Sequence, residues 1–245
     1  MTNTVQMLKE QLHSPNAETR SRAALSFADA GDVNTLAILL DALRTETSLF
    51  VREDITWAIV RMGRDSVPTL IELLNDDDAA LRHHVAHVIS KISDARAVDA
   101  LISALQDENA KVVYKAAFAL GQIGDASAVP ALVGLIGHPY LELQTLLLDL
   151  MEQFADEALP LVRALATHED ETVRTQVTDI LGVMQSPGAI DALITMLQDD
   201  AWEVRFGALM ALQPVDTLQT REAIARMSDD PHPRVRGLAG MLAIS

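Results

Sequence analysis

The sequence predicts an all-α protein built as a right-handed α-solenoid, a superhelix of about eight stacked helix pairs. The main observation is a repeat, in which an apolar residue is followed by Arg or by a substitute for it. The marks are Thr19-Arg20, a degenerate copy, and then Val51-Arg52, Leu81-Arg82, Val112-Val113, Leu143-Gln144, Val173-Arg174, Val204-Arg205 and Val235-Arg236. Their successive spacings are 32, 30, 31, 31, 30, 31 and 31 residues, enough for two short helices and two turns. A second observation is that no segment has the pattern of a strand.

Each repeat is expected to hold a first helix, the A helix, and a second helix, the B helix. The predicted A helices are 3–13, 33–44, 66–74, 96–105, 127–136, 157–167, 187–197 and 217–227. The predicted B helices are 17–29, 49–62, 79–92, 110–123, 140–154, 171–184, 201–212 and 232–243. Helices of this length are marginal alone, so neighbouring pairs must stack to bury a continuous core.

The repeats run roughly 1–31, 32–63, 64–93, 94–124, 125–155, 156–185, 186–214 and 215–245. No long polar linker separates them, so we expect a single domain over residues 1–245. A capping-type residue precedes a proline at Ser14-Pro15, His138-Pro139, Ser186-Pro187 and Asp230-Pro231. We expect these prolines at first helical positions, where a missing N–H costs little.

The composition restricts the class of partner. The chain of 245 residues has 35 Asp and Glu against 19 Lys and Arg, a net charge of −16. Such a charge repels phosphate, so we expect no nucleic acid and instead a protein partner with a basic segment. The absence of cysteine excludes disulfides and thiolate chemistry. No signal peptide or membrane-spanning run is present, so a cytoplasmic protein is expected.

Four segments resemble the HEAT-repeat superfamily, in its short bacterial and phycobilisome-lyase-like form. They are VREDITWAIVRMG, VVYKAAFALGQIGDASAVPALVGLI, VRTQVTDILGVM and VRFGALMAL. The resemblance covers essentially the whole chain and implies an armadillo-like scaffold, although such repeats serve many unrelated tasks. It also implies that the B helices line a concave groove. The resemblance further implies a structural ladder between repeats, formed by Arg20, Arg52, Arg82, Arg174, Arg205 and Arg236.

The apolar arc of each B helix leaves the opposite positions for the groove. The candidate partner-binding residues there are Glu53, Trp57, His83, His87, Tyr114, Phe118, Asp149, Glu152, Asp179, Phe206 and Met210. We interpret them as aromatic anchors beside an acidic band, in a chain that is only 4% aromatic. The alternative is that the aromatic residues belong to the core, and that Phe206 and Met210 are core or dimer surface.

No catalytic residue and no cofactor are assigned. His83 and His87 have the spacing of two metal ligands on a helix, with His84 beside them, but the glutamate of an HExxH motif is missing. The bland alternative is a polar face with incidental histidines. Deoxyhypusine hydroxylases are HEAT-repeat enzymes built on His-Glu dyads, and this chain has a single dyad, His168-Glu169. Asp149 and Glu152 lack a visible pocket for acid–base chemistry.

Two classes of function remain. The first is a non-catalytic interaction scaffold or adaptor that holds a protein segment in its groove. The second is an accessory protein resembling a bilin lyase subunit, which handles a chromophore or its acceptor protein. A His-based metal-binding HEAT protein is a further alternative. The ladder position is Val113 in the fourth repeat and Gln144 in the fifth, which predicts a flexible point there.

Overall fold

The protein is all-helical throughout the part that the structure describes. The computed structural model describes residues 3–243, and its regular elements are α-helices and short 3-10 helices. The chain forms two compact units, residues 1–125 and 126–245. Each unit contains four helix pairs, and the expectation of one domain over the whole chain stays a prediction.

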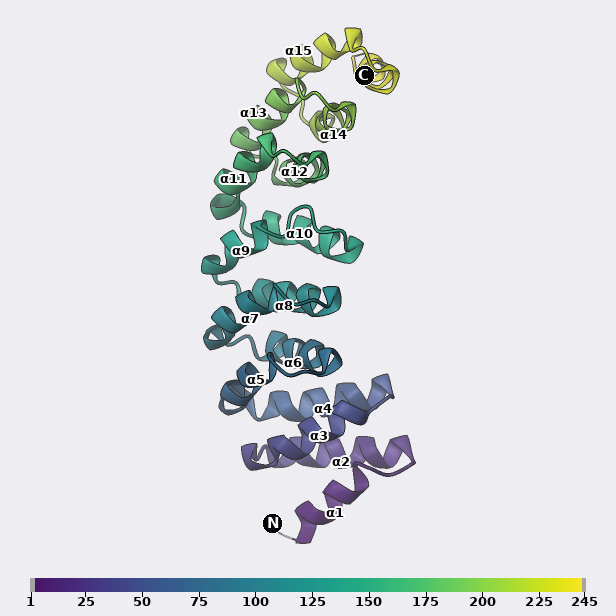
Figure 1. Cartoon of the computed structure of the whole chain (residues 1–245), viewed down its shortest axis with the longest axis vertical. Helices are drawn as coiled ribbons and strands as arrows, with labels where there is room; N and C mark the ends of the chain where they lie inside the picture. The colour runs from purple at the N-terminus through teal and green to yellow at the C-terminus, as the bar shows by residue number, and fades with distance from the viewer. Residues whose placement is uncertain (1–2, 244–245) are drawn as a thin grey trace. The chain divides into compact units, whose positions relative to one another are not determined.

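Unit 1 consists of two layers of helices. Its A helices are α1 (Asn3–Gln11), α3 (Leu36–Thr45), α5 (Val67–Leu73) and α7 (Val98–Ala104). Its B helices are α2 (Ala17–Ala30), α4 (Leu49–Arg61), α6 (Ala79–Ile92) and α8 (Ala110–Ile123). The B helices pack in chain order, α2 on α4, α4 on α6 and α6 on α8 (Figure 1). This packing presents successive B helices side by side.

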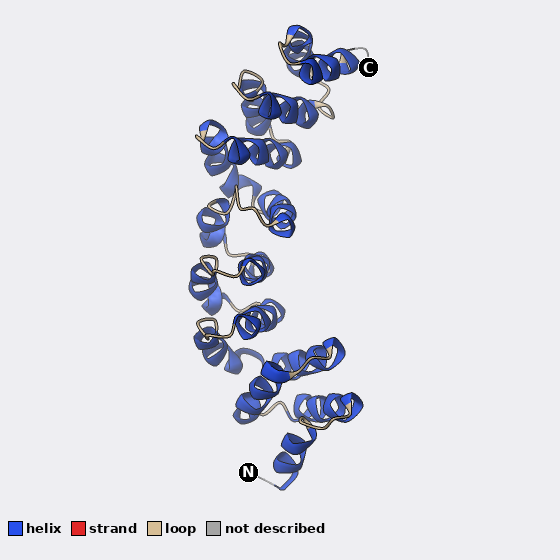
Figure 2. Ribbon diagram, turned by 45° about the vertical axis from the view of Figure 1, so that its right-hand side comes forward, coloured by secondary structure: helices blue, strands red, loops and turns tan. Residues whose placement is uncertain are grey.

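Unit 2 repeats the same arrangement. Its A helices are α9 (Val129–Val133), α11 (Ala155–Ala164), α13 (Pro187–Met196) and α15 (Leu218–Arg226). Its B helices are α10 (Leu141–Gln153), α12 (Glu171–Met184), α14 (Trp202–Leu212) and α16 (Pro233–Leu242). These B helices also pack on one another in order. Figure 2 shows the described residues of both units as helices and loops.

The predicted B helices agree with the structure to within one or two residues, whereas several A helices begin later than expected. A 3-10 turn precedes the A helix at Val33–Thr35, Gly63–Ser66, Ala95–Ala97 and Ala126–Ala128. Local capping stabilises two of these turns, because Asp32 accepts from the Asn34 N–H at 3.0 Å and Asp94 accepts from the Arg96 N–H at 3.0 Å.

Three of the four proline expectations are wrong. Only Pro187 lies at the first position of its helix as predicted, after the cap Ser186. The helices α2, α10 and α16 start two residues beyond Pro15, Pro139 and Pro231. At α2 the reason is the cap, because the Asn16 side chain accepts from the Thr19 N–H at 3.2 Å.

Buried aliphatic side chains fill the space between the layers of each unit. Ile55 and Ile59 of α4 and Leu81 of α6 are almost fully buried in unit 1, as are Leu132 and Leu143 in unit 2. Each such side chain contributes roughly 2 kcal/mol of transfer free energy. Within residues 3–243, no helix combines the length and the apolar character needed to cross a membrane.

Candidate partner-binding surfaces

Four of the six predicted ladder arginines join the turn of their own repeat to the turn of the next. The Arg82 guanidinium donates to both carboxylate oxygens of Asp107 at 2.6 and 2.8 Å, and to the Asp76 carbonyl at 2.7 Å. Three further arginines donate in the same way to one carboxylate and to one backbone carbonyl. These are Arg20 with the Glu46 carboxylate and the Ser14 carbonyl, Arg174 with the Asp199 carboxylate and the His168 carbonyl, and Arg205 with the Asp230 carboxylate and the Asp199 carbonyl. These bidentate pairs hold adjacent B helices in register.

Among the residues that the structure describes, two of the predicted ladder arginines bond only to backbone. Arg52 donates to the Glu46 carbonyl at 2.7 Å, and Arg236 donates to the Asp230 carbonyl at 2.5 Å. The Asp76 carboxylate is bound instead by Arg44 at 2.6 Å, and this hydrogen bond lowers the pKa of Asp76 to about 2. Where the ladder position lacks arginine, Val113 is buried.

Six predicted partner-binding residues of unit 1 lie outside the core, on three adjacent B helices. They are Glu53 and Trp57 of α4, His83 and His87 of α6, and Tyr114 and Phe118 of α8. Trp57 is 51% exposed, although it is one of the largest apolar side chains in the chain. Because α6 packs between α4 and α8, these residues share one side of the unit. We call them the aromatic–histidine surface.

Lys115 also belongs to this surface, and sequence reasoning missed it. Its ammonium group lies over the Phe118 ring, 4.9 Å from the centroid, and 5.6 Å from the Tyr114 centroid. The available signal was charge, because α6 and α8 contain no Asp or Glu in a chain that has 35. Among the described residues, Lys91, Lys111 and Lys115 form no salt bridge.

Partial burial suppresses the positive charge of the histidines. Burial, with further contributions from His84 and Lys115, lowers the pKa of His83 to about 4. Burial and Lys115 also lower the pKa of His87, whereas Glu53 acts in the opposite direction. The Glu53 carboxylate lies 3.4 Å from Nε2 of His87, and Nδ1 of His87 is buried without a hydrogen-bond partner. Neutral imidazoles therefore surround a lysine at pH 7.

The histidines do not assemble a metal centre within the described residues, where no three or more His, Cys, Asp or Glu side chains converge as ligands. The rings of His83 and His84 meet edge to face, with centroids 5.3 Å apart. His87 has a single carboxylate close to it, that of Glu53.

In unit 2 the predicted acidic residues are exposed, and one of them lines a cavity. Asp179 of α12 borders a space of about 190 Å³ whose other walls include Leu141, Thr145 and Leu148 of α10. Although the side chain is partly open to solvent, burial raises the pKa of Asp179. Burial alone causes the shift, without a contribution from Asp149 or Glu152. The three carboxylates lie on two helices, Asp149 and Glu152 on α10 and Asp179 on α12.

The remaining predicted residues lie on α14. Met210 is 47% exposed and Phe206 is partly exposed. The Phe206 ring lies 6.3 Å from the ring of Trp202, which stacks on His232 at 4.1 Å. Sequence reasoning missed this aromatic contact because Trp202 falls outside the positions assigned to the groove.

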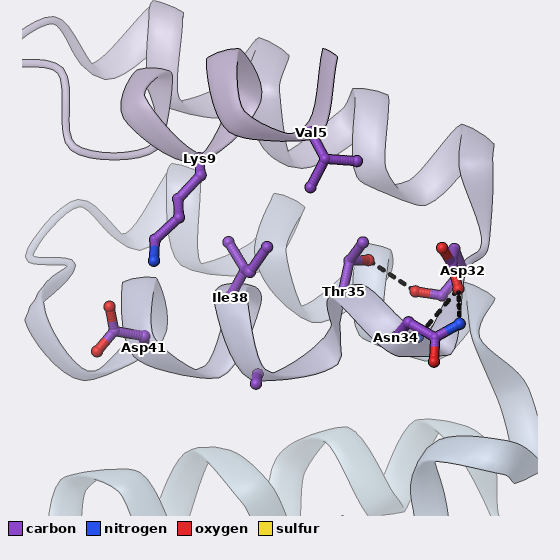
Figure 3. Close-up of a pocket in the computed structure, with 8 residues that line it drawn as sticks. Val5, Lys9, Asp32, Asn34, Thr35, Ile38 and Asp41 are labelled. Carbon is purple, nitrogen blue, oxygen red and sulfur yellow. Dashed lines mark hydrogen bonds between the residues drawn. The ribbon is translucent and has the colours of Figure 1, made fainter. Parts of the chain in front are cut away.

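A further cavity lies in unit 1, between α1 and α3, and was not predicted. Its volume is about 910 Å³. Figure 3 shows Val5 of α1 opposite Ile38 of α3, with Lys9 and Asp41 toward one end of the space. The predicted sites all lie on B helices, so the sequence did not indicate this cavity between two A helices.

The comparisons with known proteins concern the repeats. A family model of HEAT repeats matches residues 67–145, 138–213 and 158–243. No curated protein matches the chain.

Among solved structures, the CpcE–CpcF complex of the phycocyanin lyase from Nostoc sp. has 22% identity and a TM-score of 0.46, with 99% of this chain and 96% of that chain covered. Human deoxyhypusine hydroxylase in complex with glycerol has 16% identity and a TM-score of 0.41, with 97% and 94% covered. An engineered protein has 18% identity and a TM-score of 0.40, with 98% and 77% covered. The family model spans most of the sequence, and the chain belongs to the HEAT-repeat family.

Proposed function

We propose that the protein is a non-catalytic scaffold that holds a segment of a partner protein against the exposed faces of its B helices. The observation that carries this proposal is the aromatic–histidine surface, where Trp57, Tyr114 and Phe118 all lie outside the core. Only 4% of the residues of the chain are aromatic, and aromatic side chains that lie outside the core contribute little to its stability. Partly exposed aromatic residues on neighbouring elements are typical of interaction sites.

The cavity beside Asp179 supports a basic segment as one ligand of the scaffold. Its volume of about 190 Å³ is below the roughly 300–1,000 Å³ of sites for drug-sized ligands, so it suits a single side chain. The Leu141 and Leu148 side chains provide apolar walls for an aliphatic stem, and the Asp179 carboxylate provides a counter-charge. A lysine or arginine of a partner has both parts.

A double substitution tests the scaffold function directly. Peptides selected by phage display against the full chain should bind about tenfold more weakly after Trp57→Ala and Phe118→Ala, because aromatic anchors dominate such interfaces. Binding is measured by fluorescence anisotropy, and the thermal unfolding midpoint should stay nearly unchanged because both positions lie outside the core.

The control is Leu218→Ala, which removes another exposed large side chain, 72% exposed, from the A helix α15. Equal peptide binding by the double variant and this control would contradict the proposal. A collapse of the unfolding transition in the double variant would instead assign Trp57 and Phe118 to the core.

A further inference from the structure

We infer that the aromatic–histidine surface binds an acidic segment of the partner, whose carboxylate is held by Lys115. The inference rests on the proposed scaffold function and assigns the charge of the segment that this surface takes. It differs from the expectation drawn from the net charge of −16, which favours basic partners everywhere. Local charge decides the matter, because at physiological salt exposed charges farther apart than about 8 Å are largely screened.

The local charge of this part of unit 1 is opposite to that of the chain. The chain contains only four lysines, and three of them, Lys91, Lys111 and Lys115, lie on α6 and α8. These two helices pack directly on each other and contribute no carboxylate. Arg82 of α6 is already neutralised by Asp107, so the lysines are the cations left for a ligand.

Lys115 is the best placed of the three lysines. Its ammonium group is half-buried and lies over the Phe118 ring, and burial lowers its pKa. Folding has therefore already removed much of the water around this cation. Lys115 has no ion pair among the described residues. A carboxylate that reaches it would form a charge-assisted hydrogen bond at a site of reduced dielectric.

The Glu53 carboxylate lies beside His87 and would compete with the ligand. It is exposed, lies 3.4 Å from Nε2 of His87, and raises the pKa of Lys115 against the effect of burial. A bound carboxylate would be repelled by Glu53. Removal of the Glu53 charge should therefore strengthen binding, whereas removal of the Lys115 charge should weaken it.

The surroundings favour a peptide over a polyanion. The lysines occupy two helices of a protein with a net charge of −16, so a long chain of phosphates would meet repulsion beyond this area. A short segment with one or two carboxylates between apolar residues would not. Its apolar side chains would contact Trp57, Tyr114 and Phe118.

The test compares two fluorescent peptides by anisotropy, using the full chain. One alternates Asp and Glu with Leu and Phe, and the other replaces each acidic residue by Lys. Lys115→Met should weaken the acidic peptide about tenfold, and Glu53→Gln should strengthen it about threefold. The basic peptide should not respond to Lys115→Met in this way. Lys9→Met, which removes the same charge from α1, is the matched control and should have no effect.

A second measurement does not depend on the variants. Titration of the acidic peptide should raise the pKa of Lys115 in the unsubstituted protein, observed by NMR of isotope-labelled lysine. The inference is overturned if Lys115→Met leaves the affinity for the acidic peptide unchanged and the peptide also leaves the pKa of Lys115 unchanged. It is also overturned if a single-stranded oligonucleotide displaces the labelled peptide at a lower concentration than the unlabelled peptide does. Loss of self-association of the chain in Lys115→Met, in place of loss of peptide binding, would likewise overturn it.

The failure of this inference can be distinguished from failure of the scaffold function. If selected peptides and the basic peptide bind but the acidic peptide does not, only the inference fails. If no peptide binds at all, the scaffold function fails.

Discussion

The B-helix pair α6–α8 of unit 1 and the pair α10–α12 of unit 2 occupy equivalent places in the repeat but carry opposite charge. The helices α6 and α8 contain Arg82, three lysines and three histidines, and no acidic residue. The helices α10 and α12 contain five acidic residues and one arginine, Arg174, which is paired with Asp199. The repeat thus fixes the buried positions and leaves the charge of the exposed ones free.

Disruption of the arginine–carboxylate ladder, which both pairs share, should have the largest effect on stability. Arg82→Met in unit 1 and Arg205→Met in unit 2 each leave a nearly buried carboxylate without its partner, Asp107 and Asp230 respectively. We expect each to lower the free energy of unfolding by about 3 kcal/mol, measured by denaturant titration.

The exposed pair Glu18–Arg22 provides the control. Arg22→Met should change stability by only about 0.3 kcal/mol. If Arg82→Met and Arg205→Met were no more costly than Arg22→Met, the ladder would not be a structural element of the repeats.

The acidic side of the comparison can be tested by charge removal. Asp149→Asn, Glu152→Gln and Asp179→Asn together should weaken the basic peptide about tenfold and flatten the salt dependence of its affinity. The acidic peptide should not be weakened. A matched variant, Asp156→Asn, Glu157→Gln and Glu169→Gln, removes the same charge from other exposed positions of unit 2. Equal effects of the two triple variants would show that net charge, rather than the surface of α10 and α12, attracts the peptide.

A change of pH should act on the two surfaces with opposite sign, and with the smallest effect, about twofold to threefold. Between pH 7 and pH 5 a small fraction of His83, whose pKa is lowered to about 4, gains a proton beside His84, His87, Lys111 and Lys115, with Glu53 of α4 opposing them. The added positive charge should strengthen the acidic peptide.

Asp179, whose pKa is raised by burial, loses its negative charge at a higher pH than an ordinary aspartate does. It should therefore hold the basic peptide less well as the pH falls. Anisotropy titrations at the two pH values check both signs. Parallel changes for the two peptides would contradict the assignment of opposite charges to the two surfaces.

The sequence predicted the B helices closely because a period near 31 residues marks each one with an apolar residue and a following Arg or substitute. It predicted the A helices less well, since Asp32 and Asp94 stabilise 3-10 turns that helical periodicity does not reveal. The helix α9 is much shorter than expected, with Gly134 directly after it and Gly137 at a φ of 100°.

The predicted exposed positions lie outside the core, but what they do depends on neighbours that the repeat pattern does not identify. Lys115 was missed because it lies one residue beyond a position assigned to the groove. The cavity at Asp179 was missed because side chains of a different helix, including Leu141 and Leu148, form its walls.

The ladder also determines how the length of this protein can change. Arg174 and Arg205 each contact a carbonyl six residues before and a carboxylate 25 residues after themselves. Excision of residues 174–204 would place Arg205 six residues after His168 and leave Asp230 at its present distance, so both contacts would re-form. A deletion between His168 and Asp230 that does not correspond to a whole repeat would break one of them. Where the ladder is present, it therefore favours a change of length by a whole repeat over a smaller one.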